Sequence, residues 1–231
     1  MTVMTILHSP VVGIAITLSS YALAVQLHHR WRWMPPIVAA CLPIIALILL
    51  SHETYAEYNR GGSLLTWMLG PATVSLAVPM YRNGKGLEKS LPRLGLIVLI
   101  SSIVGMATAG LTAWLLGAPL PVVMSAVPKS VTTPIAIEVC RELKGIPQIT
   151  IALVILAGVL GASFGVPLLR LFGVHDDRAI GAAIGTASHG VGTASLVRRS
   201  EMQATVSSWA MAAAGVFTSL LAALLALFLR H

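Results

Sequence analysis

Charged side chains are scarce in this chain. Only 10% of its 231 residues are Asp, Glu, Lys or Arg, whereas 56% are hydrophobic and the mean hydropathy is +0.86. A soluble domain carries about 25% charged residues, so there is too little polar surface here to cover a water-soluble globule. The composition predicts an all-α, multi-pass membrane protein in contact with the lipid bilayer. The net charge of +7 comes from short basic clusters between apolar runs, which argues against nucleic acid as a partner.

Cysteines are few and catalytic motifs are absent. The two cysteines, Cys41 and Cys140, lie in apolar runs, so we expect buried hydrophobic side chains and no disulfide or metal site. The chain has no H-E-x-x-H, no G-x-S-x-G and no phosphate-binding loop. A Ser–Lys catalytic pair could be formed by Lys129 with either Ser130 or Ser188. The pair with Ser130 is disfavoured because adjacent residues point to different faces of a helix. We therefore expect neither an enzyme nor a bound cofactor.

Eight apolar runs are long enough to cross a bilayer as helices, since about twenty residues suffice. They cover residues 10–27, 34–51, 63–81, 93–116, 120–138, 148–170, 178–197 and 206–229. Basic residues alternate between the loops. Ten lie on one side (Arg30, Arg32, Arg82, Lys85, Lys89, Arg93, Arg141, Lys144, Arg198 and Arg199) and four on the other (Arg60, Arg170, Arg178 and Arg230). Because cytoplasmic loops are rich in Lys and Arg, both termini are expected outside the cytoplasm.

The amino terminus has no basic stretch before the first apolar run, so that run is expected to be a retained span and the bacterial inner membrane the location. We expect one integral membrane domain over residues 1–231. A faint internal repeat relates "GPATVSLAVPMYRN" at residue 70 to "GTASHGVGTASLVRR" at residue 185 and would divide the chain into halves, 1–116 and 117–231. Four spans per half would make the halves parallel, whereas inverted halves need a re-entrant segment in each; alternatively the similarity is accidental.

Three of the predicted spans contain an unusual share of Pro, Gly and hydroxyl residues: 69–79, 127–136 and 185–195. Such residues weaken helices and free backbone groups at membrane depth, which is tolerated where the backbone lines a polar cavity. We expect helix breaks at Pro71, Pro79, Pro128, Pro134, Gly190 and Gly192. The alternative for each residue alone is simpler. Small residues four apart, such as Gly181 and Gly185, often mark close helix packing, and Ser or Thr often bonds its own backbone.

Lys129 lies near the middle of a predicted span, where an unpaired charge costs several kcal/mol. Seven of the eight acidic residues fall in predicted loops, and Glu138 is more than two helical turns away along the same span. We therefore interpret the missing anion as the substrate. The alternative is that the ammonium bonds carbonyls freed by Pro128 and Pro134, or reaches water.

His189 is the only one of seven histidines inside a predicted span. A neutral imidazole there can be satisfied by two hydrogen bonds, whereas its titration range would also suit proton coupling; both interpretations stay open. The absence of a buried carboxylate disfavours cation exchange and favours movement of an anion.

The same three segments resemble the LrgB/CidB family. The match rests on "GPATVSLAVPMYRN", "PKSVTTPIA" and "GTASHGVGTA", in that order, and extends over essentially the whole chain. The resemblance implies a polytopic inner-membrane protein paired with a smaller LrgA/CidA-type protein, which modulates murein hydrolase export and autolysis in a holin-like way. A plant chloroplast relative exchanges glycolate and glycerate. The wider superfamily has broken helices near the midplane and implies an elevator-type transporter that forms a homodimer.

Together these observations predict a transporter of small organic monocarboxylates such as glycolate, glycerate, lactate or pyruvate, with proton coupling as one option. The alternative is the holin-like modulator of murein hydrolases. The expected substrate-binding residues are Lys129, Ser130, Thr132, Thr133, Thr186, Ser188, His189 and Thr73.

Overall fold

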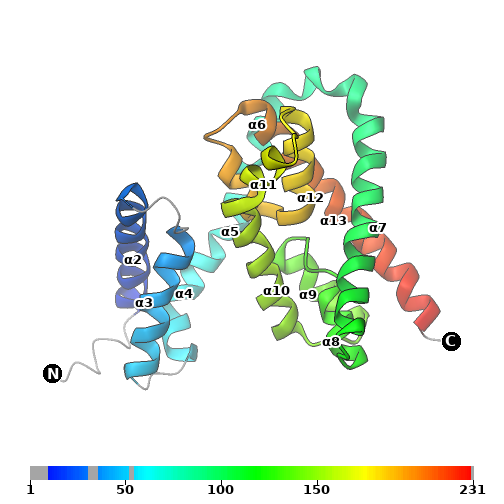
Figure 1. The fold of residues 1–231 in the computed structure, drawn as a ribbon. Helices are drawn as coiled ribbons and strands as arrows, with labels where there is room; N and C mark the ends of the chain where they lie inside the picture. The colour runs from blue at the N-terminus through cyan, green and yellow to red at the C-terminus, as the bar shows by residue number, and fades with distance from the viewer. Residues whose placement is uncertain (1–9, 31–35, 52–54, 230–231) are drawn as a thin grey trace. The chain divides into compact units, whose positions relative to one another are not determined.

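The computed structural model describes residues 10–30, 36–51 and 55–229, and the regular elements in these ranges are all helical. The chain forms two compact units, an amino-terminal unit up to Val74 and a carboxy-terminal unit from Ser75. The boundary between them lies at residues 74 and 75. Figure 1 shows the helices of both units.

The amino-terminal unit consists of α2 (Pro10–Arg30), α3 (Pro36–Ser51), α4 (Tyr55–Trp67) and most of α5 (Leu69–Ser75). Gly13 lets α2 approach α4 closely, because a β-carbon at this position would lie 3.3 Å from the carbonyl oxygen of Tyr58. Thr17 forms a 2.8 Å hydrogen bond with the Tyr58 hydroxyl, and Ser20 donates to the Ala40 carbonyl at 2.8 Å. Small and hydroxyl-bearing residues therefore join these helices, as is usual in membranes.

The carboxy-terminal unit contains the remaining helices. They are α6 (Ala77–Asn83), α7 (Leu91–Leu115), α8 (Leu120–Ala126), α9 (Thr133–Glu142), α10 (Pro147–Leu160), α11 (Val166–Leu171), α12 (Asp177–Leu196) and α13 (Glu201–Leu229). Two short 3₁₀ helices, η1 (Gly84–Gly86) and η2 (Glu88–Ser90), precede α7, and a π-helical turn, η3 (Gly161–Gly165), joins α10 to α11. The helices α7 and α13 run the length of this unit (Figure 1).

Five helical segments in the described ranges are long and apolar enough to cross a membrane. They are Val11–His28, Gly61–Arg82, Glu88–Leu115, Pro147–Leu171 and Glu201–Phe228, with a shorter apolar helix at Pro36–Leu50. Their hydrophobic side chains are largely exposed, as lipid contact requires. The two other predicted spans, 120–138 and 178–197, each fold back on themselves.

The first hairpin comprises residues 120–142, with α8 and α9 as its arms and residues 127–132 as its tip. A continuous helix would place Leu120 about 35 Å from Leu143, yet both residues line one groove together with Lys144. The segment after the second arm also packs against the first arm, because the Ser125 hydroxyl of α8 accepts the backbone N–H of Ile146 at 2.7 Å. The chain therefore enters and leaves this hairpin at one end of the unit.

The second hairpin comprises residues 177–196 and lies within α12. Its tip is His189, whose φ of 41° and ψ of −141° are not helical. A continuous helix would separate Ile180 and Leu196 by about 24 Å, but they pack in one buried cluster. The carboxylate of Asp177 accepts hydrogen bonds of 2.6 Å from both Ser200 and Gln203, just beyond the second arm. This hairpin therefore opens at the end of the unit opposite to that of the first.

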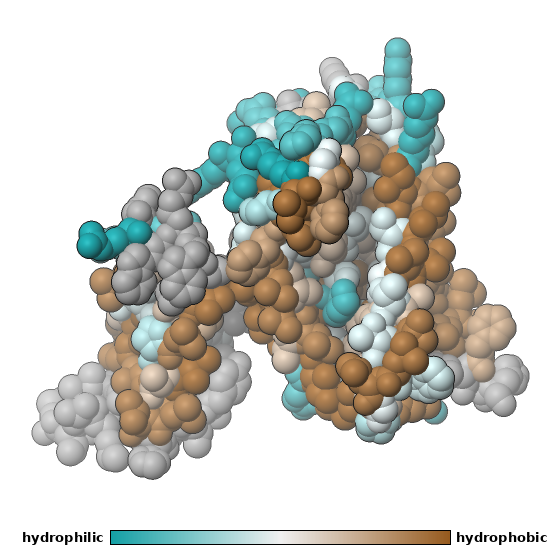
Figure 2. Space-filling view, viewed as in Figure 1, coloured by the Kyte–Doolittle hydropathy of each residue, from teal (hydrophilic) through white to brown (hydrophobic). Residues whose placement is uncertain are grey.

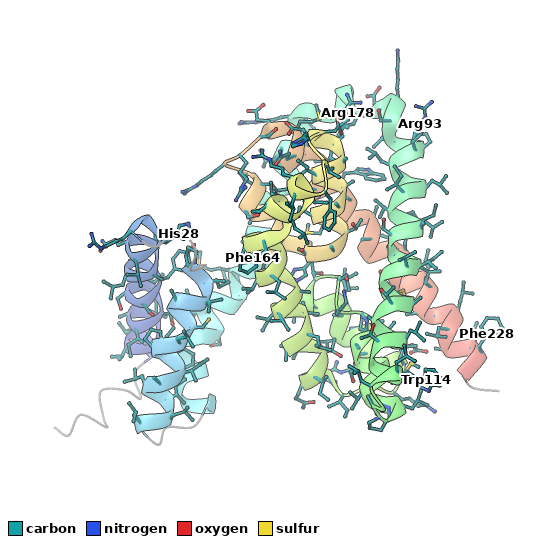
Figure 3. All side chains as sticks on the ribbon, in the orientation of Figure 1. His28, Arg93, Trp114, Phe164, Arg178 and Phe228 are labelled. Atoms are coloured by element: carbon teal, nitrogen blue, oxygen red, sulfur yellow. The ribbon has the colours of Figure 1, made fainter. Side chains whose placement is uncertain are left out.

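Basic residues gather at the end where the second hairpin opens. Arg178 donates to Ser90 there at 3.4 Å, and Figure 3 shows Arg93 and Arg178 at this end and Trp114 and Phe228 toward the other. By chain connectivity, the segments at this end also carry Arg82, Lys85, Lys89, Arg170, Arg198 and Arg199, which makes eight basic residues, whereas Arg141 and Lys144 follow the first hairpin toward the other end. Figure 2 shows hydrophilic surface at the same end and hydrophobic surface along the flank of the unit.

The first hairpin can be tested by sided labelling. In a background without cysteine, Leu116→Cys and Lys144→Cys should react with a membrane-impermeant maleimide from the same side of the membrane, because both residues lie at the end where the first hairpin opens. Arg178→Cys should react only from the opposite side. The native cysteines are replaced by alanine; Cys140 is buried as predicted, whereas the prediction for Cys41 is wrong because it is exposed on the apolar helix α3. Labelling of Leu116→Cys and Lys144→Cys from opposite sides would restore a continuous span between them.

Candidate functional site

The tips of the two hairpins meet on α10, at Val154. The side chain of Val154 is fully buried and packs against Val131, in the tip of the first hairpin, and Ala136. Its carbonyl oxygen lies 2.9 Å from Nε2 of His189, the tip of the second hairpin. One residue in the middle of α10 thus contacts both chain reversals, which enter from opposite ends of the unit.

Lys129 lies in the tip of the first hairpin, where residues 127–132 form turns and no regular helix. Its ammonium donates to the hydroxyl of Ser130 at 3.1 Å. Among the described residues no carboxylate forms an ion pair with it; the nearest acidic residue in sequence, Glu138, pairs with Arg141 at 2.6 Å on the exposed side of α9. The half-buried ammonium is thus held beside one neutral hydroxyl and keeps further donors available for an anion.

The second hairpin packs on glycines of α10 and η3. A β-carbon at Gly158 would lie 2.8 Å from the imidazole of His189, and one at Gly161 would overlap the Ser188 side chain. One at Gly165 would overlap Ile184. These three glycines form a groove along one side of the segment, and Ser188 and His189 are buried in it.

The other side of α12 packs on α13. β-carbons at Gly181 and Gly185 would strike the backbone carbonyls of Gln203 and Ser207, so both glycines serve close helix packing. The packing interpretation of this small-xxx-small pair is therefore confirmed. Thr193 adds polar contacts, because its hydroxyl lies 2.8 Å from that of Ser207 and donates to the His189 carbonyl at 2.8 Å.

Asp177 closes the base of the second hairpin. Hydrogen bonds from Ser200 and then Gln203 hold the pKa of its carboxyl below the ordinary value. A lowered pKa means that the carboxylate stabilises the fold at neutral pH, and that this contribution is lost as the pH falls through the lowered pKa. The preceding Asp176 caps the helix by accepting the N–H of Ala179 at 2.8 Å.

The remaining predicted residues are Thr132, Thr133, Thr186 and Thr73. Thr132 and Thr133 begin α9, and Thr132 has extended backbone angles without a side-chain cap bond. Thr186 donates to the Ala182 carbonyl of its own helix at 2.8 Å. The side chain of Thr73 lies outside the described part of the structure.

Of the residues predicted to break helices, some lie at an interruption and others lie inside a helix. Pro128 is in the tip of the first hairpin and Pro134 in the first turn of α9. Gly190 directly follows the non-helical His189, and Gly192 lies within the second arm. Pro71 and Pro79 lie inside α5 and α6, and the interruption between these helices is at Leu76.

Sequence reasoning missed the wall on which the second hairpin rests. Val154 contributes a backbone carbonyl. Every residue has one, so this role could not be predicted from the amino-acid type. The glycines 158, 161 and 165 were readable, since their spacing places them on one face of a helix, but glycine alone is more often a packing residue. No group of three or more His, Cys, Asp or Glu in the described part of the chain could hold a metal ion.

Comparison with known proteins supplies the family. The model of the LrgB-like family matches residues 17–228, a range that includes both hairpins. The chain belongs to the LrgB family. Among its relatives, an uncharacterized protein of Haemophilus influenzae is 34% identical over 209 residues, covering 90% of each chain. YwbG of Bacillus subtilis, also uncharacterized, is 34% identical over 210 residues, covering 90% of this chain and 93% of its own.

A third LrgB relative carries a functional name. The antiholin-like protein LrgB of Bacillus mycoides is 30% identical over 213 residues, covering 91% of this chain and 93% of its own length. No solved structure matches the chain. The evidence for the two hairpins is therefore the set of contacts within this chain that are described above.

A side chain placed in the glycine groove should reduce the stability of the protein. Gly161→Ala should destabilise the protein by about 1–3 kcal/mol, because the added methyl group would force Ser188 and the second hairpin to move. Gly84→Ala is the matched control: its backbone is helical, with φ −60° and ψ −36°, and no atom lies within 4 Å of the added methyl. Thermal unfolding in detergent measures both; equal melting temperatures would show that the hairpin does not rest on this groove.

Proposed function

We propose that this LrgB-family protein is a carrier, and not an enzyme, for small organic monocarboxylates of the size of glycolate, glycerate, lactate or pyruvate. The observation that carries the proposal is the Lys129 ammonium at the tip of the first hairpin, with the Ser130 hydroxyl as its hydrogen-bond partner and no paired carboxylate in the described residues. A cation at this depth requires an anion or water, and a carboxylate substrate provides the anion.

The start of α9 supports an anion at the same place. This helix of ten residues begins at Thr133, four residues after Lys129. The first turn of a helix presents unpaired N–H groups and a partial positive charge. One short segment therefore combines a full positive charge, hydroxyl groups and helix N–H donors. These come from Lys129, Ser130, Thr132 and Thr133. In membrane carriers, broken helices present such ends to anionic substrates.

The division of the chain into two units and the two hairpins of the second unit support an elevator-type carrier. The proposed site lies wholly within the carboxy-terminal unit, and the second compact unit of the chain is the proposed stationary part. Hairpins that enter from opposite ends and stop at Val154 leave a short barrier on each side of the site. We propose six crossing helices and two re-entrant hairpins, which together account for the eight predicted segments.

Orientation and assembly follow as further parts of the proposal. The end with eight basic residues is placed in the cytoplasm by the positive-inside rule, in a bacterial inner membrane, with both termini outside. The homodimer and the small LrgA/CidA-type membrane partner are carried from the resemblance. His189 is the candidate proton carrier: with Nε2–H donating to the Val154 carbonyl, Nδ1 remains as an acceptor in the neutral ring.

An antiholin-like role is the second candidate, favoured by the name of the Bacillus mycoides relative. The two functions predict different behaviour of the purified protein. A carrier moves a specific solute with saturation, whereas a pore-forming or pore-modulating protein alters the general permeability of vesicles. Proteoliposomes loaded with a fluorescent dye distinguish them, because a carrier retains the dye while taking up radiolabelled glycolate.

Removal of the ammonium tests the carrier. Lys129→Met should abolish saturable uptake of radiolabelled glycolate into proteoliposomes while leaving the protein folded, because it removes a half-buried charge. Lys129→Arg should also fail, since a planar guanidinium does not replace a compact ammonium. Lys144→Met is the matched control, as this exposed lysine lies beyond the base of the first hairpin; it should transport normally. Normal uptake by Lys129→Met would refute the assignment.

A further inference from the structure

Ser102, in the middle of α7, is a buried hydroxyl group without a partner. Its side chain is 7% exposed, and its Oγ has no hydrogen-bond partner. Several other hydroxyl residues in helices bond a carbonyl of their own turn; Thr108 of the same helix donates to Val104 at 2.7 Å. Ser102 does not, although an unsatisfied buried hydroxyl reduces stability. Such a group calls for a ligand or water that supplies the missing bond.

The face of α7 that carries Ser102 leads to the proposed site. Val98, one turn before it, packs against Ala210 and Ala214 of α13. Gly105, three residues after it, lies against the tip of the first hairpin, because a β-carbon there would be 3.9 Å from the Ser130 hydroxyl. Residues three and four apart share a helix face. Ser102 thus lies within about one turn, ~5 Å along the axis, of the point where α7 meets Ser130.

We infer that Ser102 is a substrate-binding residue that determines specificity, and that its hydroxyl bonds the oxygen on the carbon next to the substrate carboxylate. This inference rests on the proposed function. Lys129 and Ser130 hold the carboxylate from the hairpin, and Ser102 recognises the second polar group from a membrane-crossing helix. A serine hydroxyl both donates and accepts, so it serves a 2-hydroxy acid or a 2-oxo acid. A plain fatty acid leaves it unpaired and is bound less well.

Acetate, which lacks the second oxygen, provides the test. The wild type should prefer glycolate to acetate as an inhibitor of radiolabelled glycolate uptake. Ser102→Ala should raise the KM for glycolate roughly fivefold, the value of one neutral hydrogen bond, and leave the inhibition constant of acetate within about twofold. Ser102→Thr keeps the hydroxyl and should keep the preference.

The matched control is Ser208→Ala. Ser208 is also buried, at 3% exposure, with an unpaired Oγ, but it lies on α13 next to Trp209, which faces Gly95 near the start of α7. Its loss should leave the KM for glycolate and the preference over acetate unchanged. If Ser102→Ala does not fold, Ser102→Cys gives the same reading, because a thiol is a weak donor of similar size.

The outcomes separate the two proposals. If the wild type shows saturable uptake and Ser102→Ala keeps the preference for glycolate over acetate, only the role of Ser102 is overturned. Ser102 is then a small packing residue, and the proposed function stands. An equal loss for glycolate and acetate also overturns it, since the hydroxyl would then not read the second oxygen. Absence of saturable uptake by the wild type overturns the proposed function, and the role of Ser102 with it.

Discussion

Two chain reversals inside a unit with an apolar flank impose the constraint on which the rest of the structure depends. Lipid offers no hydrogen bonds, so each N–H and C=O freed at a reversal must be satisfied within the protein or in a water-filled cavity. The second reversal meets this demand with neighbours: the His189 imidazole bonds the Val154 carbonyl, and the His189 carbonyl accepts from Thr193. The glycines of α10 and η3 follow from this, since only a surface without side chains lets the buried tip approach that carbonyl.

Hydropathy and charge predicted the helices but could not distinguish a crossing from a hairpin. Residues 120–138 and 178–197 are as long as a span, and length is what the apolar pattern reports. The count of basic residues cannot distinguish the two cases either. When both segments become hairpins, Arg141 and Lys144 exchange sides with Arg170 and Arg178, so two basic residues replace two and the predicted charge difference does not change. Only contacts such as that between Asp177 and Ser200 reveal the return of the chain.

The candidate site was predictable where its chemistry lies in side chains. Lys129 stood out because a charge without a partner is costly at membrane depth, and its position in a non-helical tip follows from Pro128 and Pro134 on either side. Val154 was invisible because it acts through its backbone, and Ser102 because one serine in an apolar helix is unremarkable until its hydroxyl is found unpaired. Thr186 matches the pattern as well as Ser130 does, yet it bonds its own helix.

The contacts of the second hairpin bear on how a carrier of this kind would expose its site. This hairpin is held at its base by Asp177, along one arm by Gly181 and Gly185 against α13, and at its tip by His189. Opening it alone would break all three contacts at once and expose polar groups. Sliding the whole carboxy-terminal unit breaks none of them, because every partner lies within that unit. For the proposed carrier, the internal bonding of the hairpin therefore favours movement of the unit as one body over a gate that opens at the hairpin.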